Sequence, residues 1–76
     1  MPSAVIKRSV VIDGHKTSVT LEDPFWTGLK EIAQNSNLTL SSLVGQVEAT
    51  RVDANLSSAL RMFVFQHFRR EQSANL

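Results

Sequence analysis

The sequence predicts an α+β fold that is mostly helical, with a β-hairpin at its N-terminal end followed by three helices. Three observations predict it: period-two alternation on both sides of an Asp-Gly dipeptide, an Asp-Pro dipeptide at 23–24, and later apolar residues at helical spacing. The 76 residues suit a single domain over 1–76. A chain this short usually needs a staple or a partner to fold. Cysteine is absent and there are only two histidines, so disulfides and a structural zinc site are excluded and a second subunit is expected.

The hairpin is expected to pair a strand at 5–12 with a strand at 16–21. Asp13-Gly14 favours a tight type I′ turn between them. A two-residue loop would place Ile12 opposite His15, although the register stays open by one residue. This register gives one mostly apolar face, with Arg8 as its exception, and one polar and basic face. The apolar face would hold Ile6, Val10, Ile12, Thr17, Val19 and Leu21, and the polar face Lys7, Ser9, Val11, Lys16, Ser18 and Thr20.

Capping residues mark the three helices. The first is expected at about 24–36, with Asp23 as N-cap and Pro24 as its first residue. The second is expected at about 40–51, capped by Thr39 or Ser41, and the third at about 56–70, capped by Asn55 or Ser57. Residues 71–76 are expected to form a frayed tail.

The apolar residues of these elements are expected to form a core shared by two copies. The third helix is apolar over more than one stripe, so it should be packed on both sides, by its own chain and by a second copy or another protein. The predicted dimer core is Val19, Leu21, Phe25, Trp26, Leu29, Leu43, Leu60 and Phe63.

Charge and composition narrow the function classes. The net charge is only +1, but the hairpin region carries Lys7, Arg8 and Lys16 against Asp13 alone. No apolar stretch approaches the length of a membrane span and no signal peptide opens the chain, so a cytoplasmic protein is expected. Neither histidine has a cysteine, an acid pair or a glycine-rich phosphate loop beside it, so no catalytic residue, metal or cofactor is expected and the protein is not expected to be an enzyme.

Four separated motifs occur in order along the chain. They are Lys-Arg-Ser-Val at 7–10, Gly-His-x-Thr-Ser-Val-x-Leu-Glu at 14–22, Phe-Trp at 25–26 and Asn-Leu-Ser-Ser-Ala-Leu-Arg-x-Phe-Val at 55–64. With them, most of residues 7–68 resembles the small bacterial subfamily of Arc/MetJ-like ribbon-helix-helix domains. The resemblance implies an intertwined homodimer and a transcriptional regulator whose paired strands enter the major groove of double-stranded DNA.

The resemblance also implies roles for particular residues. By the family's pattern, Lys16, Ser18 and Thr20 would face the bases. The start of the second helix, at Ser41 and Ser42, would offer backbone amides to a DNA phosphate. The basic character of the first segment, rather than the resemblance, adds Lys7 and Arg8 as candidate DNA contacts.

Two departures from the simplest form of this fold, the strand at 5–12 and the third helix, leave an alternative open. A strand at 5–12 would occupy one edge of the strand at 16–21, and pairing with a dimer mate on the other edge would give a four-stranded sheet. Such a sheet is too broad for a groove of roughly 12 Å. Either residues 5–12 swing away as a basic arm, or the scaffold serves another purpose. The alternative function is a dimerisation or protein-interaction module without DNA binding, with the apolar third helix or the free sheet edge as the contact.

Overall fold

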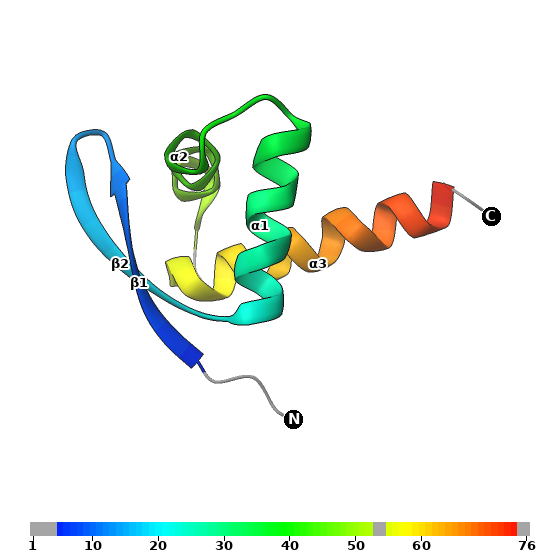
Figure 1. Ribbon diagram of the computed structural model, residues 1–76, viewed down its shortest axis with the longest axis horizontal. Coiled ribbons are helices and arrows are strands. Elements are labelled where there is room, and N and C mark those ends of the chain that lie inside the picture. Colours follow the sequence, from blue (N-terminus) through cyan, green and yellow to red (C-terminus); the bar gives the residue numbers. More distant parts are fainter. Residues whose placement is uncertain (1–4, 53–54, 75–76) are drawn as a thin grey trace.

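A computed structural model describes residues 5–52 and 55–74 of the chain. It confirms the predicted fold class, an N-terminal hairpin followed by three helices (Figure 1). The elements are β1 (Val5–Ile12), β2 (His15–Glu22), α1 (Asp23–Asn35), α2 (Leu40–Thr50) and α3 (Leu56–Ala74). The second copy of the predicted homodimer stays a prediction.

The hairpin has the predicted register. β1 pairs antiparallel with β2, with Ile12 opposite His15 and Ser9 opposite Ser18. Asp13 and Gly14 have φ values of 51° and 80°, and two consecutive positive φ angles are what a type I′ turn requires. Residues 5–12 are therefore a strand rather than a swinging arm. Among the described residues, the sheet consists of these two strands alone.

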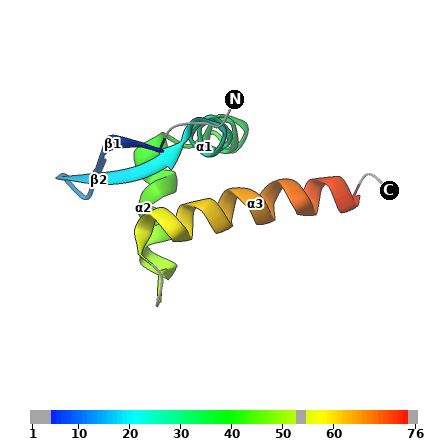
Figure 2. The ribbon, with the colours of Figure 1, turned by 90° about the horizontal axis from the view of Figure 1, so that it is seen from below.

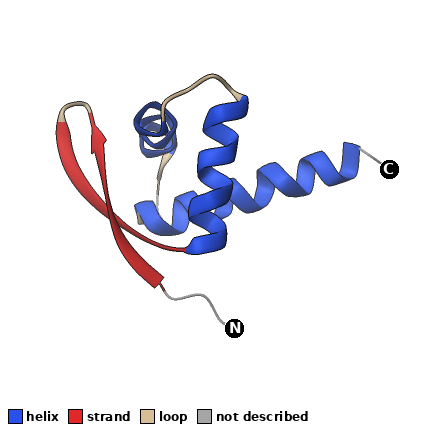
Figure 3. Ribbon diagram, in the orientation of Figure 1, coloured by secondary structure: helices blue, strands red, loops and turns tan. Residues whose placement is uncertain are grey.

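The two faces of the hairpin differ as the alternation predicts. Val10, Val19 and Leu21 are buried beneath it, at 6%, 1% and 0% exposure, and the helices lie on that side (Figure 3). All six residues of the predicted polar face are exposed. Ile6 points to the helical side but is 41% exposed, so the end of the hairpin near the N-terminus extends past the cover that the helices provide.

Helix α1 begins one residue earlier than the predicted cap implies. Asp23 is its first residue, and the N-cap is Glu22, which has an extended backbone and makes no side-chain capping bond. The prediction of Asp23 as N-cap was wrong because β2 runs without a loop into the helix, which leaves Glu22 as the last extended residue. The Asp23 carboxylate still lies in the first turn, where the helix dipole favours it.

The end of α1 has the geometry of a Schellman motif. Asn37 has a φ of 57°, its amide donates to the Gln34 carbonyl, and the Leu38 amide donates to the Ala33 carbonyl at 2.9 Å. These bonds satisfy carbonyl groups that the helix end leaves without partners. They also set the direction in which the chain enters α2.

Two N-cap candidates were predicted for each of α2 and α3, and in both helices the cap is the candidate that comes first in the sequence. The hydroxyl of Thr39 accepts a hydrogen bond from the Ser42 amide at 3.0 Å, and the side-chain oxygen of Asn55 accepts one from the Ser58 amide at 2.9 Å. Helix α3 then continues to Ala74, so residues 71–74 are helical and not the expected tail. Residues 75–76 lie outside the described part of the chain.

The core lies where β1 and β2 meet the three helices. α3 crosses beneath the other helices, and its second half projects away from them (Figure 2). None of the helices, over the residues described, is long and apolar enough to cross a membrane. The buried apolar residues are Val10, Val19, Leu21, Leu29, Ile32, Ala33, Leu43, Val44, Val47, Leu60 and Val64.

Candidate nucleic-acid interface

The outward face of the hairpin brings together most of the residues predicted to contact DNA. Antiparallel pairing places Lys7 beside Thr20 and Val11 beside Lys16. These side chains leave the sheet on the side opposite the core because successive residues of a strand alternate in direction. Between Lys7 and Val11 on β1 and Lys16 and Thr20 on β2, the face contains no carboxylate. We call the exposed set the ribbon face; it consists of Lys7, Ser9, Val11, Lys16, Ser18 and Thr20.

One residue of the ribbon face is also held by α3. The Thr20 amide donates to the Ser57 hydroxyl at 3.0 Å, and the Thr20 carbonyl accepts from the Arg61 guanidinium at 3.1 Å. The hydroxyl oxygens of Thr20 and Ser57 are 3.4 Å apart. The sequence reasoning missed Ser57 and Arg61 in this role, because they are 37 and 41 residues away and no local pattern points to the contact.

This contact limits how β2 can pair with another strand. One edge of β2 is hydrogen-bonded to β1, and at Thr20 the other edge is bonded to α3. A strand from a second copy would have to displace both bonds to pair there. Within the described chain the sheet is two strands wide, and the outer edge of β1 is not paired with any described strand.

The same helix neutralises the acidic end of β2. The Arg61 guanidinium donates to the Glu22 carboxylate at 2.9 Å. This hydrogen bond is the main reason why the pKa of Glu22 lies below its usual range. Glu22 is paired with an arginine and lies at the margin of the ribbon face, so it adds little unbalanced negative charge to that surface.

Arg8 does not belong to the ribbon face. It lies on the helical side of β1, where its guanidinium forms an ion pair with Asp23 and its side chain is 17% exposed. Its guanidinium carbon is 4.9 Å from the centre of a Trp26 ring, a distance suited to a cation–π contact. Arg8 therefore ties β1 to the start of α1, and the structure separates it from Lys7, with which it was grouped as a DNA contact.

The start of α2 lies next to the tip of the hairpin. Ser41 and Ser42 are exposed, and they line a surface cavity of about 490 Å³ together with Val11 and Asp13. The first backbone bond of α2 runs from the Leu43 amide to the Thr39 carbonyl, so the amides ahead of it are not used in the helical ladder. The Ser42 amide among them donates to the Thr39 hydroxyl. Asp13 adds a negative charge at this point.

The residues predicted as a dimer core divide into two groups. Val19, Leu21, Leu29, Leu43 and Leu60 are buried within the single chain. They already have partners in their own protomer, so a second copy could reach them only if the protomer opened. Partial exposure is left at Phe25, Trp26 and Phe63.

No cluster of three metal-ligating side chains occurs in residues 5–52 and 55–74. His15 is exposed at the hairpin turn. His67 lies on α3, with its Nε2 atom 3.5 Å from the Glu71 carboxylate and its ring edge-on to Phe68. These surroundings give neither histidine a nucleophile to activate.

Comparison with known proteins identifies the family. The family described as "Ribbon-helix-helix domain" matches residues 5–68. The fold is similar to that of an uncharacterized protein from Bordetella pertussis Tohama I, with a TM-score of 0.78 and 28% sequence identity over 97% of this chain. The chain corresponds to 63% of that protein's length. Nothing matches among curated proteins. The family match spans both strands and most of the helical part, so this chain belongs to the ribbon-helix-helix domain family, which consists generally of non-catalytic DNA-binding regulators.

Proposed function

We propose that the protein is a sequence-specific DNA-binding regulator that places its β-hairpin in the major groove. The observation that carries the proposal is the ribbon face, an exposed surface with two lysines and three hydroxyl side chains on a sheet only two strands wide. The major groove admits a two-stranded ribbon. In the simplest form of the fold two protomers each supply one strand, whereas here one chain supplies both.

The chemistry of the ribbon face fits both parts of DNA recognition. Lys7 and Lys16 can neutralise phosphates or donate to guanine, and Ser9 and Ser18 can donate to or accept from base edges. The Thr20 hydroxyl already lies 3.4 Å from the Ser57 hydroxyl. We therefore assign base reading first to Lys16 and Ser18, whose side chains form no hydrogen bond with a described residue. Ser41 and Ser42, beside the hairpin tip, would receive the flanking phosphate.

The test is a fluorescence-anisotropy titration of duplex DNA of random sequence at two salt concentrations. Binding should weaken steeply with salt, and Lys16→Gln should lower both the affinity and the slope of log affinity against log salt, the latter by about 0.9. Lys30→Gln is the matched control, because Lys30 is an exposed lysine on α1 outside the hairpin. Absence of salt-dependent binding, or equal losses in both variants, would reject the proposal.

A protein-interaction module is the second candidate function, and one observation favours it. Helix α3 exposes large apolar side chains, including Met62 and Phe65. Isolated domains rarely leave contiguous apolar surface of this kind uncovered. If the protein binds no duplex DNA even at low salt, this surface becomes the better guide to its function.

A further inference from the structure

Two side chains of α3 satisfy both backbone polar groups of one residue of β2. The Thr20 amide donates to the Ser57 hydroxyl at 3.0 Å, and the Thr20 carbonyl accepts from the Arg61 guanidinium at 3.1 Å. In an antiparallel ladder the amide and the carbonyl of one residue point to the same edge of the strand. α3 therefore offers the outer edge of β2 an acceptor and a donor, as the backbone of a neighbouring strand would.

The spacing of the two side chains lets one helix make both bonds. Ser57 and Arg61 stand at positions i and i+4 of α3, so they lie on the same face of the helix. The Arg61 guanidinium is itself held, because its Nε atom donates to the Glu22 carboxylate at 2.9 Å. Glu22 is the last residue of β2 and the N-cap of α1. The contact therefore joins the end of β2, the start of α1 and the start of α3.

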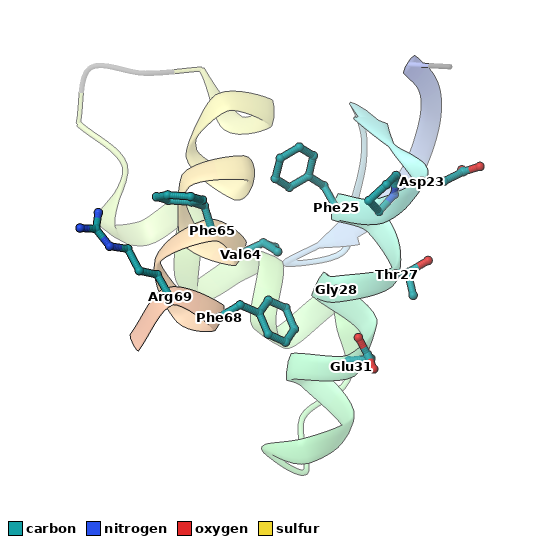
Figure 4. Close-up of a pocket in the computed structure, with 10 residues that line it drawn as sticks. Asp23, Phe25, Thr27, Gly28, Glu31, Val64, Phe65, Phe68 and Arg69 are labelled. Carbon is teal, nitrogen blue, oxygen red and sulfur yellow. The ribbon is translucent and has the colours of Figure 1, made fainter. Parts of the chain in front are cut away.

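The part of α3 that makes this contact is fixed by packing. Leu60, which lies between Ser57 and Arg61, is fully buried, and Val64 is almost so. A Cβ atom built at Gly28 would lie 2.9 Å from Cγ1 of Val64, so α1 and α3 cross closely at this point (Figure 4). α3 is therefore a firm support for the edge of β2.

The inner face of β2 is attached to the helices in a different way, through buried apolar side chains. These are Val19 and Leu21. Apolar burial is non-directional, so it tolerates small changes in the twist and tilt of a ribbon. Hydrogen bonds weaken steeply when their geometry changes. The two bonds at Thr20 therefore restrict the orientation of β2 more tightly than the apolar contacts do.

We propose that Ser57 and Arg61 are positioning residues for DNA recognition, which hold β2 so that the ribbon face fits the base edges of a specific sequence. This role rests on the proposed function of the ribbon face. Ser18 lies on the same face of β2 as Thr20, so a change of strand direction at Thr20 moves it as well. Base reading needs aligned hydrogen bonds, whereas attraction to phosphates needs charge. Loss of the contact should therefore lower specificity and leave non-specific affinity nearly unchanged.

The first measurement tests the contact in the free protein, without DNA. Ser57→Ala removes the acceptor of the Thr20 amide, so hydrogen exchange of this amide, followed by NMR, should become about two- to tenfold faster. Ser58→Ala is the matched control, because Ser58 is the next residue of α3 and its hydroxyl bonds to no residue that the structure describes. Ser57→Thr keeps a hydroxyl and should restore slow exchange. Equal exchange rates in Ser57→Ala and Ser58→Ala would overturn the inference.

The second measurement compares specific with non-specific DNA. The wild-type protein selects a duplex from a random pool, and that duplex and the unselected pool are each titrated by anisotropy at one salt concentration. Ser57→Ala should lower the ratio of the two affinities by about tenfold, and Ser57→Thr should restore it. Affinity for the unselected pool should stay within about twofold in both variants, because the lysines of the ribbon face are unchanged. Ser58→Ala should leave both affinities as they are in the wild type.

Arg61→Lys tests the other half of the contact without a change of charge. A lysine ammonium lacks the planar fork of donors, so it does not hold Glu22 and Thr20 in the same geometry. The ratio of affinities should fall, while the slope of log affinity against log salt should stay the same. Arg70→Lys is the control, since Arg70 is an exposed arginine near the end of the same helix.

The outcomes separate the positioning role from the function on which it rests. A wild-type chain that binds neither duplex rejects the proposed function, and the positioning role with it. Salt-dependent binding whose ratio of affinities is unchanged in Ser57→Ala or in Arg61→Lys overturns the positioning role alone, and the ribbon face remains a DNA-binding surface. Circular dichroism of each variant establishes folding before either measurement.

Discussion

At the scale of single residues, the same side-chain type has different roles according to which face of a strand it occupies. Lys7 and Arg8 are adjacent in sequence, yet Lys7 is exposed on the ribbon face and Arg8 packs against Trp26 and pairs with Asp23. The alternation of the strand predicted this separation. What it could not supply was the partner of Arg8, because Asp23 is 15 residues away and approaches only when α1 folds against β1.

Replacing Asp13 with asparagine tests whether DNA approaches the hairpin tip. Asn-Gly suits a type I′ turn as well as Asp-Gly does, so the hairpin should be unchanged while one negative charge beside Ser41 and Ser42 is lost. Asp13→Asn should therefore raise DNA affinity, and more at low salt than at high salt. Anisotropy titrations of both proteins measure the difference. Unchanged affinity would place the hairpin tip outside the DNA contact.

The Glu22–Arg61 pair should make stability depend on pH. Because the hydrogen bond from Arg61 lowers the pKa of Glu22 in the folded state, the unfolded chain binds this proton more readily than the folded one. The pair's contribution is then present above the usual range for glutamate and disappears as pH falls through the lowered pKa. NMR titration should find the midpoint of the Glu22 titration below the usual range for glutamate. Arg61→Gln should raise that midpoint back into the usual range. An unshifted midpoint in the wild type would show that the pair does not persist in solution.

At the scale of elements, most of the architecture is present in local sequence patterns. The Asp-Gly turn set the strand register, and the caps at Thr39 and Asn55 set the starts of α2 and α3. Two of the differences from the predicted boundaries have clear physical reasons. β2 passes directly into α1 with no loop between them, so Asp23 became the first helical residue. α3 runs to Ala74 because residues 71–74 contain neither proline nor glycine to end it.

Two mid-helix glycines should respond in opposite ways to alanine. At Gly28 the new methyl group would overlap the buried, β-branched Val64, and overpacking of this kind costs about 1–3 kcal/mol, more than the helix propensity gained. At Gly45 the nearest contact is an ordinary 3.7 Å, to Cγ2 of Ile12, so alanine should stabilise by up to about 1 kcal/mol. Urea denaturation of both variants measures this. A stable Gly28→Ala protein would mean that α3 can shift away from α1 at little cost.

At the scale of the whole molecule, α3 completes the hydrophobic core that the hairpin and the first two helices begin. Leu60 and Val64 complete the core, and Ser57 and Arg61 hold the edge of β2. The sequence predicted that α3 must pack on both sides but could not identify which residues each side would contact. Five of the eight residues predicted for the dimer core are buried within one chain, and their part in a contact between two copies stays a prediction.

Dimerisation, which membership of the ribbon-helix-helix family implies generally, should make thermal stability depend on protein concentration. When two folded chains associate and unfolded chains do not, raising the concentration shifts the equilibrium toward the folded dimer. The Tm of the protein should therefore rise across a hundredfold concentration series, by a few degrees for a domain of this size. Differential scanning calorimetry makes the comparison, and a wild-type Tm that does not change with concentration would show that the protomer is stable without a partner.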